Sequence, residues 1–240
     1  MRKAVKFANP HIHFYSVGTG SPVAMFHGFG RSGQIWQRNI SFLAQFKQVV
    51  IIDLPGHGRS EFAGRWLLRD IASQLVKWLQ QKKLSPLILV GHSMGGAIAI
   101  YLTSQMPHIV EKLILVDSIG LPLQTNAYTL MIRALLTSIY YPSGIPPWKL
   151  VSNLLRTSPG LLHQIVQDVV KSDLRTEITS ITVPTLIIWG EHDKLLPLSI
   201  GRELNAAIRG STFVVLPRSG HCPHLQEPER FNKIVAEFIL

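Results

Sequence analysis

A serine in a glycine-rich turn is the first feature of this sequence that indicates catalytic chemistry. The segment Gly91-His92-Ser93-Met94-Gly95 has the pattern G-x-S-x-G and follows the apolar, β-rich run of residues 87–90. An apolar helical pattern over residues 94–105 follows. Because a strand, a sharp turn and a helix in this order lift the hydroxyl to the helix N-terminus, Ser93 is predicted to be a nucleophile rather than part of an ordinary glycine turn.

A serine hydroxyl is a weak nucleophile until a base removes its proton, so a histidine and an acid are expected further along the chain. A strand pattern over residues 185–189 leads to Asp193, and another over residues 212–216 leads to His221. Each candidate lies just past the end of a strand, where a loop can direct its side chain at the nucleophile. The order serine, acid, histidine then predicts His221 as the general base and Asp193 as the acid that orients it.

Two other residues compete for these roles. Asp117 follows the strand pattern of residues 112–116 and is a second candidate acid, although Asp117-Ser118 is more typical of a structural turn. Asp193 is favoured because it lies in a Gly-x-x-Asp loop and precedes His221. His224 is the alternative base. Three more histidines lie in glycine turns and are interpreted as making local hydrogen bonds: His27, His57 and His92.

Acyl transfer also requires donors for the negative charge that develops on the carbonyl oxygen. The segment Phe26-His27-Gly28-Phe29-Gly30 follows the strand pattern of residues 23–26. We expect the backbone N–H groups of Phe29 and Met94 to form this oxyanion hole. His11 and His13 share a strand face, but no further ligand set accompanies them, so no metal site is expected. Acyl transfer through a serine also needs no organic cofactor, and none is expected.

The elements that must position these residues alternate between β-rich runs and longer helical patterns, which is typical of a mostly parallel sheet with helices on both faces. Eight strands are predicted, at residues 4–7, 11–17, 23–26, 48–52, 87–90, 112–116, 185–189 and 212–216, and the turn signal Asn9-Pro10 predicts a hairpin between the first two. Helices are predicted at residues 34–46, 67–81, 94–105, 200–208 and 228–238.

Residues 121–180 interrupt this alternation with helical patterns around residues 128–139 and 161–170. We therefore expect a core of residues 1–120 and 181–240, with residues 121–180 as a helical lid over the carboxyl ends of the strands. Its apolar side chains either line a pocket for an apolar group or pack the lid onto the core. The candidate substrate-binding residues are Tyr128, Met131, Leu135, Tyr140 and Trp148.

Composition narrows the possible locations and partners. Among the 240 residues 46% are hydrophobic and the net charge is +10, with 12 of the 24 basic but only 3 of the 14 acidic residues in the first 85 positions. No basic run or recognisable motif indicates nucleic-acid binding. Glycines break the uncharged stretch of residues 84–110, so no stable membrane insertion is expected. Cys222 is the single cysteine, and no secretory pattern begins the chain, so a cytoplasmic location is expected.

Taken together, these motifs resemble the α/β-hydrolase superfamily along nearly the whole chain. The resemblance rests on residues 27–30, 53–60, 91–96 and 190–193 and on Gly220-His221. It implies an α/β-hydrolase fold with a mostly parallel eight-stranded sheet flanked by helices, and a structural rather than catalytic role for Asp53. Ser93 differs from the aspartate nucleophile of the dehalogenase and epoxide hydrolase relatives.

Within the superfamily, His92 before the nucleophile is similar to esterases and lipases, whereas carbon–carbon bond hydrolases often have asparagine there and cofactor-free haloperoxidases phenylalanine. The resemblance implies a serine carboxylesterase that forms an acyl-enzyme from an apolar acyl or small ester substrate. Small carboxylesterases are the best comparison, including the biotin-synthesis type that hydrolyses the methyl ester of a pimeloyl chain on an acidic acyl carrier protein. The alternatives are a perhydrolase, a carbon–carbon hydrolase and a ligand receptor that kept the triad.

Overall fold

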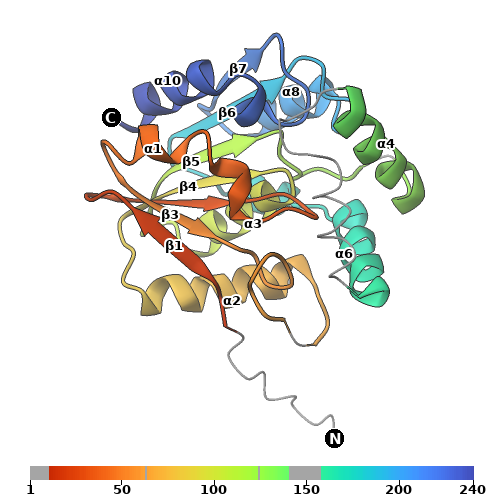
Figure 1. The fold of residues 1–240 in the computed structure, drawn as a ribbon, viewed down its shortest axis with the longest axis horizontal. Helices are drawn as coiled ribbons and strands as arrows, with labels where there is room; N and C mark the ends of the chain where they lie inside the picture. The colour runs from red at the N-terminus through yellow and green to blue at the C-terminus, as the bar shows by residue number, and fades with distance from the viewer. Residues whose placement is uncertain (1–10, 63, 124, 141–157) are drawn as a thin grey trace, which may run out of the picture.

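Short apolar runs rich in valine and isoleucine form a central sheet, as their composition predicts. The computed structural model describes residues 11–62, 64–123, 125–140 and 158–240, and within these the sheet has seven strands in the order β1-β3-β2-β4-β5-β6-β7 (Figure 1). Only β1 is antiparallel to its neighbour. The strands are β1 (Phe14–Val17), β2 (Pro22–Phe26), β3 (Gln48–Ile52), β4 (Leu87–His92), β5 (Val110–Val116), β6 (Thr185–Gly190) and β7 (Thr212–Leu216).

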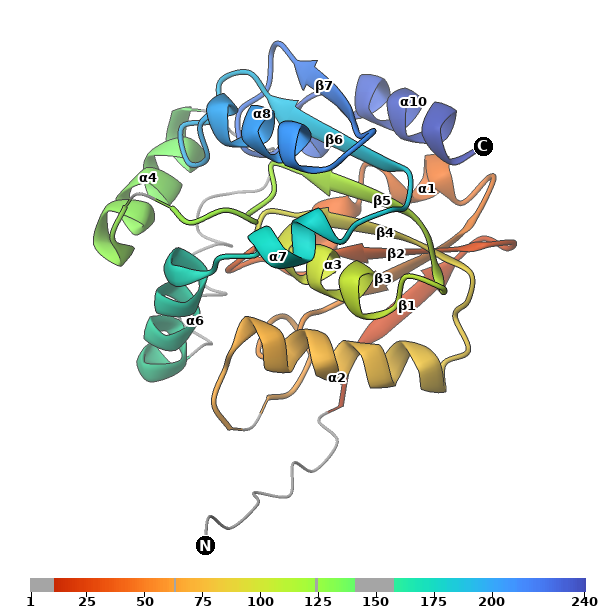
Figure 2. The ribbon, with the colours of Figure 1, turned by 180° about the vertical axis from the view of Figure 1, so that it is seen from behind.

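Helices cover both faces of this sheet, because successive strand residues point to opposite sides and both sets are apolar. In β2, Ala24 and Phe26 pack into one core, while Val23 and Met25 pack into the other. Figures 1 and 2 show the two helical layers. The first core is covered by α2 (Leu68–Gln81), α3 (Met94–Gln105), α7 (Arg175–Thr179) and α8 (Leu198–Ala207), and the second by η1 (Gly33–Trp36), α1 (Ile40–Leu43), α9 (Pro223–Gln226) and α10 (Pro228–Ile239).

The strand order creates a switch point beside β2. The chain passes from β2 to β3 on one side and then returns through α2 to β4 on the other side of β2. In open α/β sheets, sites form at such a point, outside the carboxyl ends of the strands. The segments that follow β2 and β4 are therefore brought together, and these segments contain Phe29 and Ser93.

The predicted mostly parallel sheet with flanking helices is confirmed. The sheet has seven strands where eight were predicted, and the predicted strand at residues 4–7, with its hairpin, lies outside the described residues. The single helix predicted over residues 34–46 is wrong, because the chain forms the short η1 and α1 instead. Between them the buried Asn39 donates through Nδ2 to the carbonyl oxygen of His224 and to Oδ1 of Asn232, and these long-range bonds hold the bend.

Two helices between β5 and β6 lie together beyond one end of the sheet (Figures 1 and 2). They are α4 (Ala127–Tyr140) and α6 (Pro159–Lys171). The α6 helix begins after Ser158, whose hydroxyl accepts the Leu161 N–H. Asp168 of α6 accepts the N–H of Leu68 at 2.7 Å, which fixes α6 against the start of α2.

No helix in the described part of the chain is long and apolar enough to cross a membrane. The uncharged stretch that resembled a membrane span forms β4, the turn at Ser93 and α3. Ten consecutive residues at the start of α3 are buried, which explains why that helix has apolar residues on all sides.

Candidate active site

Ser93 lies in the tight turn between β4 and α3. Its backbone angles, φ +55° and ψ −118°, belong to a region that residues other than glycine rarely adopt. Four backbone hydrogen bonds hold this conformation: the Ser93 N–H donates to the Val116 carbonyl, and the Ser93 carbonyl accepts from the N–H groups of Gly96, Ala97 and Ile119. Strain of this kind persists where the surroundings fix it, and it is typical of functional sites.

Glycines allow the segment after β2 to lie against this turn. A Cβ atom on Gly95 would lie 2.6 Å from the carbonyl oxygens of Phe26 and His27. A Cβ atom on Gly28 would lie 3.1 Å from Cβ of Ser93. These spacings are too short for side chains, so the backbone that leads to Phe29 runs beside Ser93. The N–H of Met94 lies in the first turn of α3, where amide groups have no acceptor within the helix.

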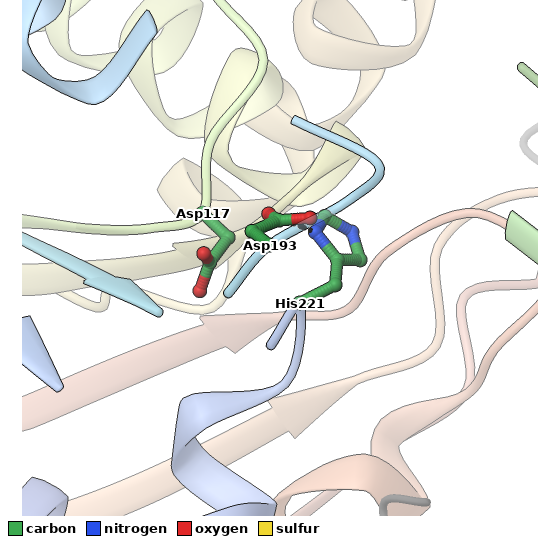
Figure 3. A group of neighbouring side chains, drawn as sticks. All are labelled: Asp117, Asp193 and His221. Atoms are coloured by element: carbon green, nitrogen blue, oxygen red, sulfur yellow. Dashed lines mark hydrogen bonds and ion pairs between the residues drawn. The ribbon is translucent and has the colours of Figure 1, made fainter. Parts of the chain in front are cut away.

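His221 and Asp193 form a buried pair. Nδ1 of His221 donates to Oδ2 of Asp193 at 2.7 Å, as Figure 3 shows. The other carboxylate oxygen of Asp193 accepts the N–H groups of Leu195 at 2.8 Å and Leu196 at 3.0 Å. The carboxylate is thereby fixed in position, and its contact with Nδ1 leaves Nε2 of His221 to act as the base.

The loops that carry this pair are tied to each other. Glu191 N–H donates to the Leu216 carbonyl at 3.0 Å, and His192 N–H donates to the Ser219 carbonyl at 2.9 Å. Gly190 lies so close to Gly220 that a Cβ atom on it would overlap the Gly220 carbonyl oxygen. The acid and the base therefore lie on one rigid unit.

His92 connects this unit to the serine turn. Its Nε2–H donates to the carbonyl oxygen of His221 at 2.7 Å, and the two ring centroids lie 4.8 Å apart. Burial lowers the pKa of His92 well below its usual value, and His224 and His221 lower it further. The expectation that His92 bonds locally is wrong, because its partner is 129 positions away. Nothing in the local sequence distinguishes a turn histidine that bonds to a distant residue from one that bonds to its neighbours.

Asp117 belongs to the same cluster. One oxygen from each carboxyl group of Asp117 and Asp193 and one ring nitrogen of His221 all lie within 4.8 Å of one another (Figure 3). Such a spacing would also suit a metal ion, but the Nδ1–H···Oδ2 bond already joins His221 to Asp193. Oδ1 of Asp117 accepts the Gly190 N–H at 3.0 Å. The structure thus joins His221 to Asp193, with the alternative acid beside them.

His224, the alternative base, lies in a different setting. Its ring is fully buried, 4.4 Å from the ring of Trp36 and 4.8 Å from that of His92. Neither ring nitrogen has a hydrogen-bond partner among the described residues, and burial lowers the pKa of His224 well below its usual value. Without a paired carboxylate, it lacks the orienting group that a general base needs.

The other motif residues bind backbone groups. Asp53 accepts the N–H groups of Gly33 at 2.7 Å and Arg59 at 2.9 Å and pairs with His13, so it organises the turn after β3. His27 lies 2.8 Å from the Gly28 carbonyl through Nδ1 and accepts the Leu54 N–H through Nε2. Burial lowers the pKa of His27, which suits this neutral tautomer.

The structure describes only some of the candidate substrate-binding residues of the predicted lid. Tyr128 lies on α4 with 75% of its surface exposed, so its side chain faces solvent and does not fit a role in lining a buried pocket. Leu130, on the same helix, is partly buried and packs against the main core. Met131, Leu135 and Tyr140 also lie on α4, but their side chains are outside what the structure describes, as is the whole of Trp148.

A mostly parallel sheet with a strained serine turn and a carboxylate–histidine pair after its strands is the arrangement of triad hydrolases. The chain belongs to the alpha/beta hydrolase family, whose model matches residues 23–234. It is 28% identical to the pimeloyl-[acyl-carrier protein] methyl ester esterase of Vibrio campbellii, with 95% of this chain and 98% of that protein covered. It is 25% identical to the uncharacterized hydrolase YugF of Bacillus subtilis, with 95% and 92% covered.

Solved structures show the same fold. A bromoperoxidase from Bacillus anthracis superposes with a TM-score of 0.86 at 22% identity, covering 96% of this chain and 95% of that one. A thermophilic esterase from Thermogutta terrifontis superposes with a TM-score of 0.84 at 23% identity, covering 96% and 93%. At these identities the likeness concerns the fold alone, so the reaction must be inferred from the site.

Proposed function

We propose that this protein is a serine carboxylic-ester hydrolase that acts through an acyl-enzyme. The observation that carries this proposal is the strained Ser93 at the start of α3, joined through His92 to the buried His221–Asp193 pair. Esterase names among relatives that match nearly their full length support an ester as the substrate.

In the first half of the reaction, Ser93 Oγ attacks the ester carbonyl carbon while His221 takes the hydroxyl proton. The imidazolium that forms is stabilised by Asp193, and it then protonates the departing alcohol. The N–H groups of Phe29 and Met94 would hold the oxyanion, and each such donor is worth about 3 kcal/mol in the transition state. In the second half, His221 activates water, which releases the acid and regenerates Ser93. None of these steps requires a metal or an organic cofactor.

A panel of esters tests the reaction class. We expect turnover of p-nitrophenyl esters and of methyl esters, with kcat/KM rising with acyl chain length if an apolar group binds beneath α4 and α6. Hydrogen peroxide should not replace water as the preferred acceptor, and vinylogous diketones should not be cleaved. Preference for either of these would indicate a perhydrolase or a carbon–carbon hydrolase on the same three residues, and binding without turnover would indicate a receptor.

A methyl ester on an acyl carrier protein is the specific substrate that we propose. The Vibrio campbellii relative carries that activity in its name, and the sequence of this chain has no acidic residue between Asp117 and Asp168. Arg133 lies in this stretch, on α4. Lys149 and Arg156 fall in it as well but lie outside the described residues. A positively charged surface would attract an acidic carrier protein, and the bound carrier could then deliver its acyl chain to the site.

Charge steering has an ionic-strength signature, because exposed charges are screened beyond about 8 Å at physiological salt. We expect kcat/KM for an acyl-carrier-protein methyl ester to fall steeply with added salt, while that for a small neutral ester changes little. Arg133→Glu should reproduce the loss for the carrier substrate only. Arg230→Glu, an exposed charge on α10, is the matched control and should change neither. An equal salt response for both substrates would reject the carrier and leave a small-ester esterase.

Cys222 is the single cysteine of the sequence and a free, buried thiol, so no intrachain disulfide requires an oxidising environment. Burial raises the pKa of Cys222 to about 12, so the thiol is unreactive although it neighbours His221. We propose a cytoplasmic location on this ground. The location is tested by cell fractionation.

A further inference from the structure

Asp117 is a buried acid for which the mechanism above has no use. It follows β5 directly, while Asp193 lies in the turn after β6, and these two strands pair in parallel with Val116 opposite Ile188. The carboxyl ends of neighbouring parallel strands lie at the same edge of a sheet, and one oxygen of each carboxyl group lies within 4.8 Å of the other. Asp117 is completely buried and Asp193 nearly so.

The carboxyl groups of Asp117 and Asp193 differ in the number of hydrogen bonds that they accept. Asp193 accepts three hydrogen bonds, from the N–H groups of Leu195 and Leu196 and from Nδ1 of His221. Asp117 accepts one, from the Gly190 N–H through Oδ1. Its Oδ2 atom is buried and has no donor among the described residues. Since hydrogen bonds to a carboxylate favour its charged form, the negative charge belongs on Asp193 and the proton on Asp117.

The backbone of Asp117 makes the choice of residue informative. Its φ of +41° lies in the left-handed region, which glycine adopts at least cost. The sequence has a carboxyl group there instead. Aspartate adopts this region more readily than most side chains do, although glycine would be less strained there.

We propose that Asp117 is a neutral positioning residue whose Oδ2–H donates a hydrogen bond to the Asp193 carboxylate and so tunes the acid that supports His221. This role rests on the function proposed above, but the protonation state does not. Burial raises the pKa of Asp117 well above its usual value, and the charge of Asp193 and a hydrogen bond to it raise the pKa further, against the lowering by the Gly190 N–H. Two carboxylates in one dry pocket share a single negative charge for the same reason.

The expected consequence is a change in the acid limb of the pH profile. A donor from Asp117 withdraws charge from Asp193, so Asp193 stabilises the imidazolium of His221 less. Removing the donor should therefore move the acid limb of kcat/KM to higher pH. Replacing an ionised Asp117 by a neutral group would have the opposite effect, because the imidazolium would lose a nearby negative charge. Other titratable groups near these residues are the Cys222 thiol, whose pKa the charges of Asp117 and Asp193 raise, and the His92 ring, whose centroid lies 4.8 Å from that of His221.

Two variants distinguish a neutral Asp117 that donates to Asp193 from an ionised Asp117. Asp117→Asn keeps an acceptor for Gly190 and an N–H donor for Asp193, so we expect kcat/KM within about threefold of wild type and an unmoved acid limb. Asp117→Gly removes the carboxyl group and relieves the backbone strain, and we expect kcat to fall about 10- to 100-fold, by analogy with the loss of hydrogen-bond partners behind metal-ligating residues. Its acid limb should move up by about half a pH unit or more. An acid limb that falls in Asp117→Asn, or stays unmoved in Asp117→Gly, would overturn the proposal.

Infrared spectroscopy tests the protonation state without any turnover. At neutral pH, the difference spectrum of wild type minus Asp117→Asn should contain the carbonyl stretch of a protonated carboxylic acid, shifted by exchange into D₂O. The exposed Asp70→Asn is the matched control and should show only carboxylate bands. Absence of the acid band in the Asp117 difference would refute a neutral Asp117 even if the esterase is active. An acid band in an inactive wild-type protein would instead place the fault in the proposed ester chemistry.

Discussion

Replacing Ser93 by alanine is expected to abolish ester turnover while leaving the fold intact. The alanine keeps the Cβ atom in the strained turn and the four backbone hydrogen bonds that fix it, so the free energy of unfolding should be nearly unchanged. The Oγ atom that would carry the acyl group is lost. Removing the nucleophile of a serine triad lowers kcat by roughly 10⁶-fold, and we expect a loss of this order in steady-state assays.

Ser118→Ala is the matched control for that variant. Ser118 is also buried and lies against the start of α3, and its hydroxyl donates only to the carbonyl oxygen of Ile119. Its loss should leave most of the activity. Undiminished turnover in Ser93→Ala, or a comparable loss in Ser118→Ala, would show that the nucleophile has been assigned to the wrong residue.

Asp193→Asn is expected to lower kcat by about four orders of magnitude with little change in the fold. Oδ1 of Asp193 accepts two backbone N–H groups, so the oxygen of the new amide would keep that position and the NH₂ group would face His221. The imidazole would then have to accept at Nδ1 and carry its proton on Nε2, where it cannot take the proton of Ser93. Circular dichroism and pre-steady-state kinetics separate this loss from unfolding.

Asp117→Asn provides the contrast for this prediction. Both variants exchange a buried carboxyl group for an amide within the same cluster, but only Asp193 is bonded to His221. If Asp117→Asn were the more damaging of the two, the orienting acid would be Asp117 and the roles would have to be reversed. High pH is not expected to restore Asp193→Asn, since the wrong tautomer is neutral, and Asp117→Asn should have no large loss to restore.

The sequence was sufficient for the parts of the site that local structure determines. Ser93 could be placed because the strand, the glycine turn and the helix are contiguous, and the same holds for the loops of Asp193 and His221 after their strands. The mostly parallel sheet followed from alternating short β-rich runs and longer helical patterns. These features depend on residues within a few positions of each other, which is where sequence patterns are informative.

Long-range contacts account for what could not be predicted. The bend between η1 and α1 depends on Asn39 bonding to residues near the C-terminus, and no breaker residue marks it in the sequence. The hydrogen bond from His92 to His221 joins two loops that only the strand order brings together. Asp117 looked like a structural turn because its neighbour in space, Asp193, belongs to the next strand of the sheet.

Covalent labelling of Ser93 is the most direct test of the account. A fluorophosphonate probe reacts with a serine only when a base activates it and oxyanion donors hold the product, so labelling reports the whole assembled site. Peptide mapping by mass spectrometry should find the adduct on Ser93 alone in wild type, no adduct in Ser93→Ala, and strongly slowed labelling in Asp193→Asn. An adduct on any other serine, or a wild-type protein that does not react, would contradict the proposal that Ser93 forms the acyl-enzyme.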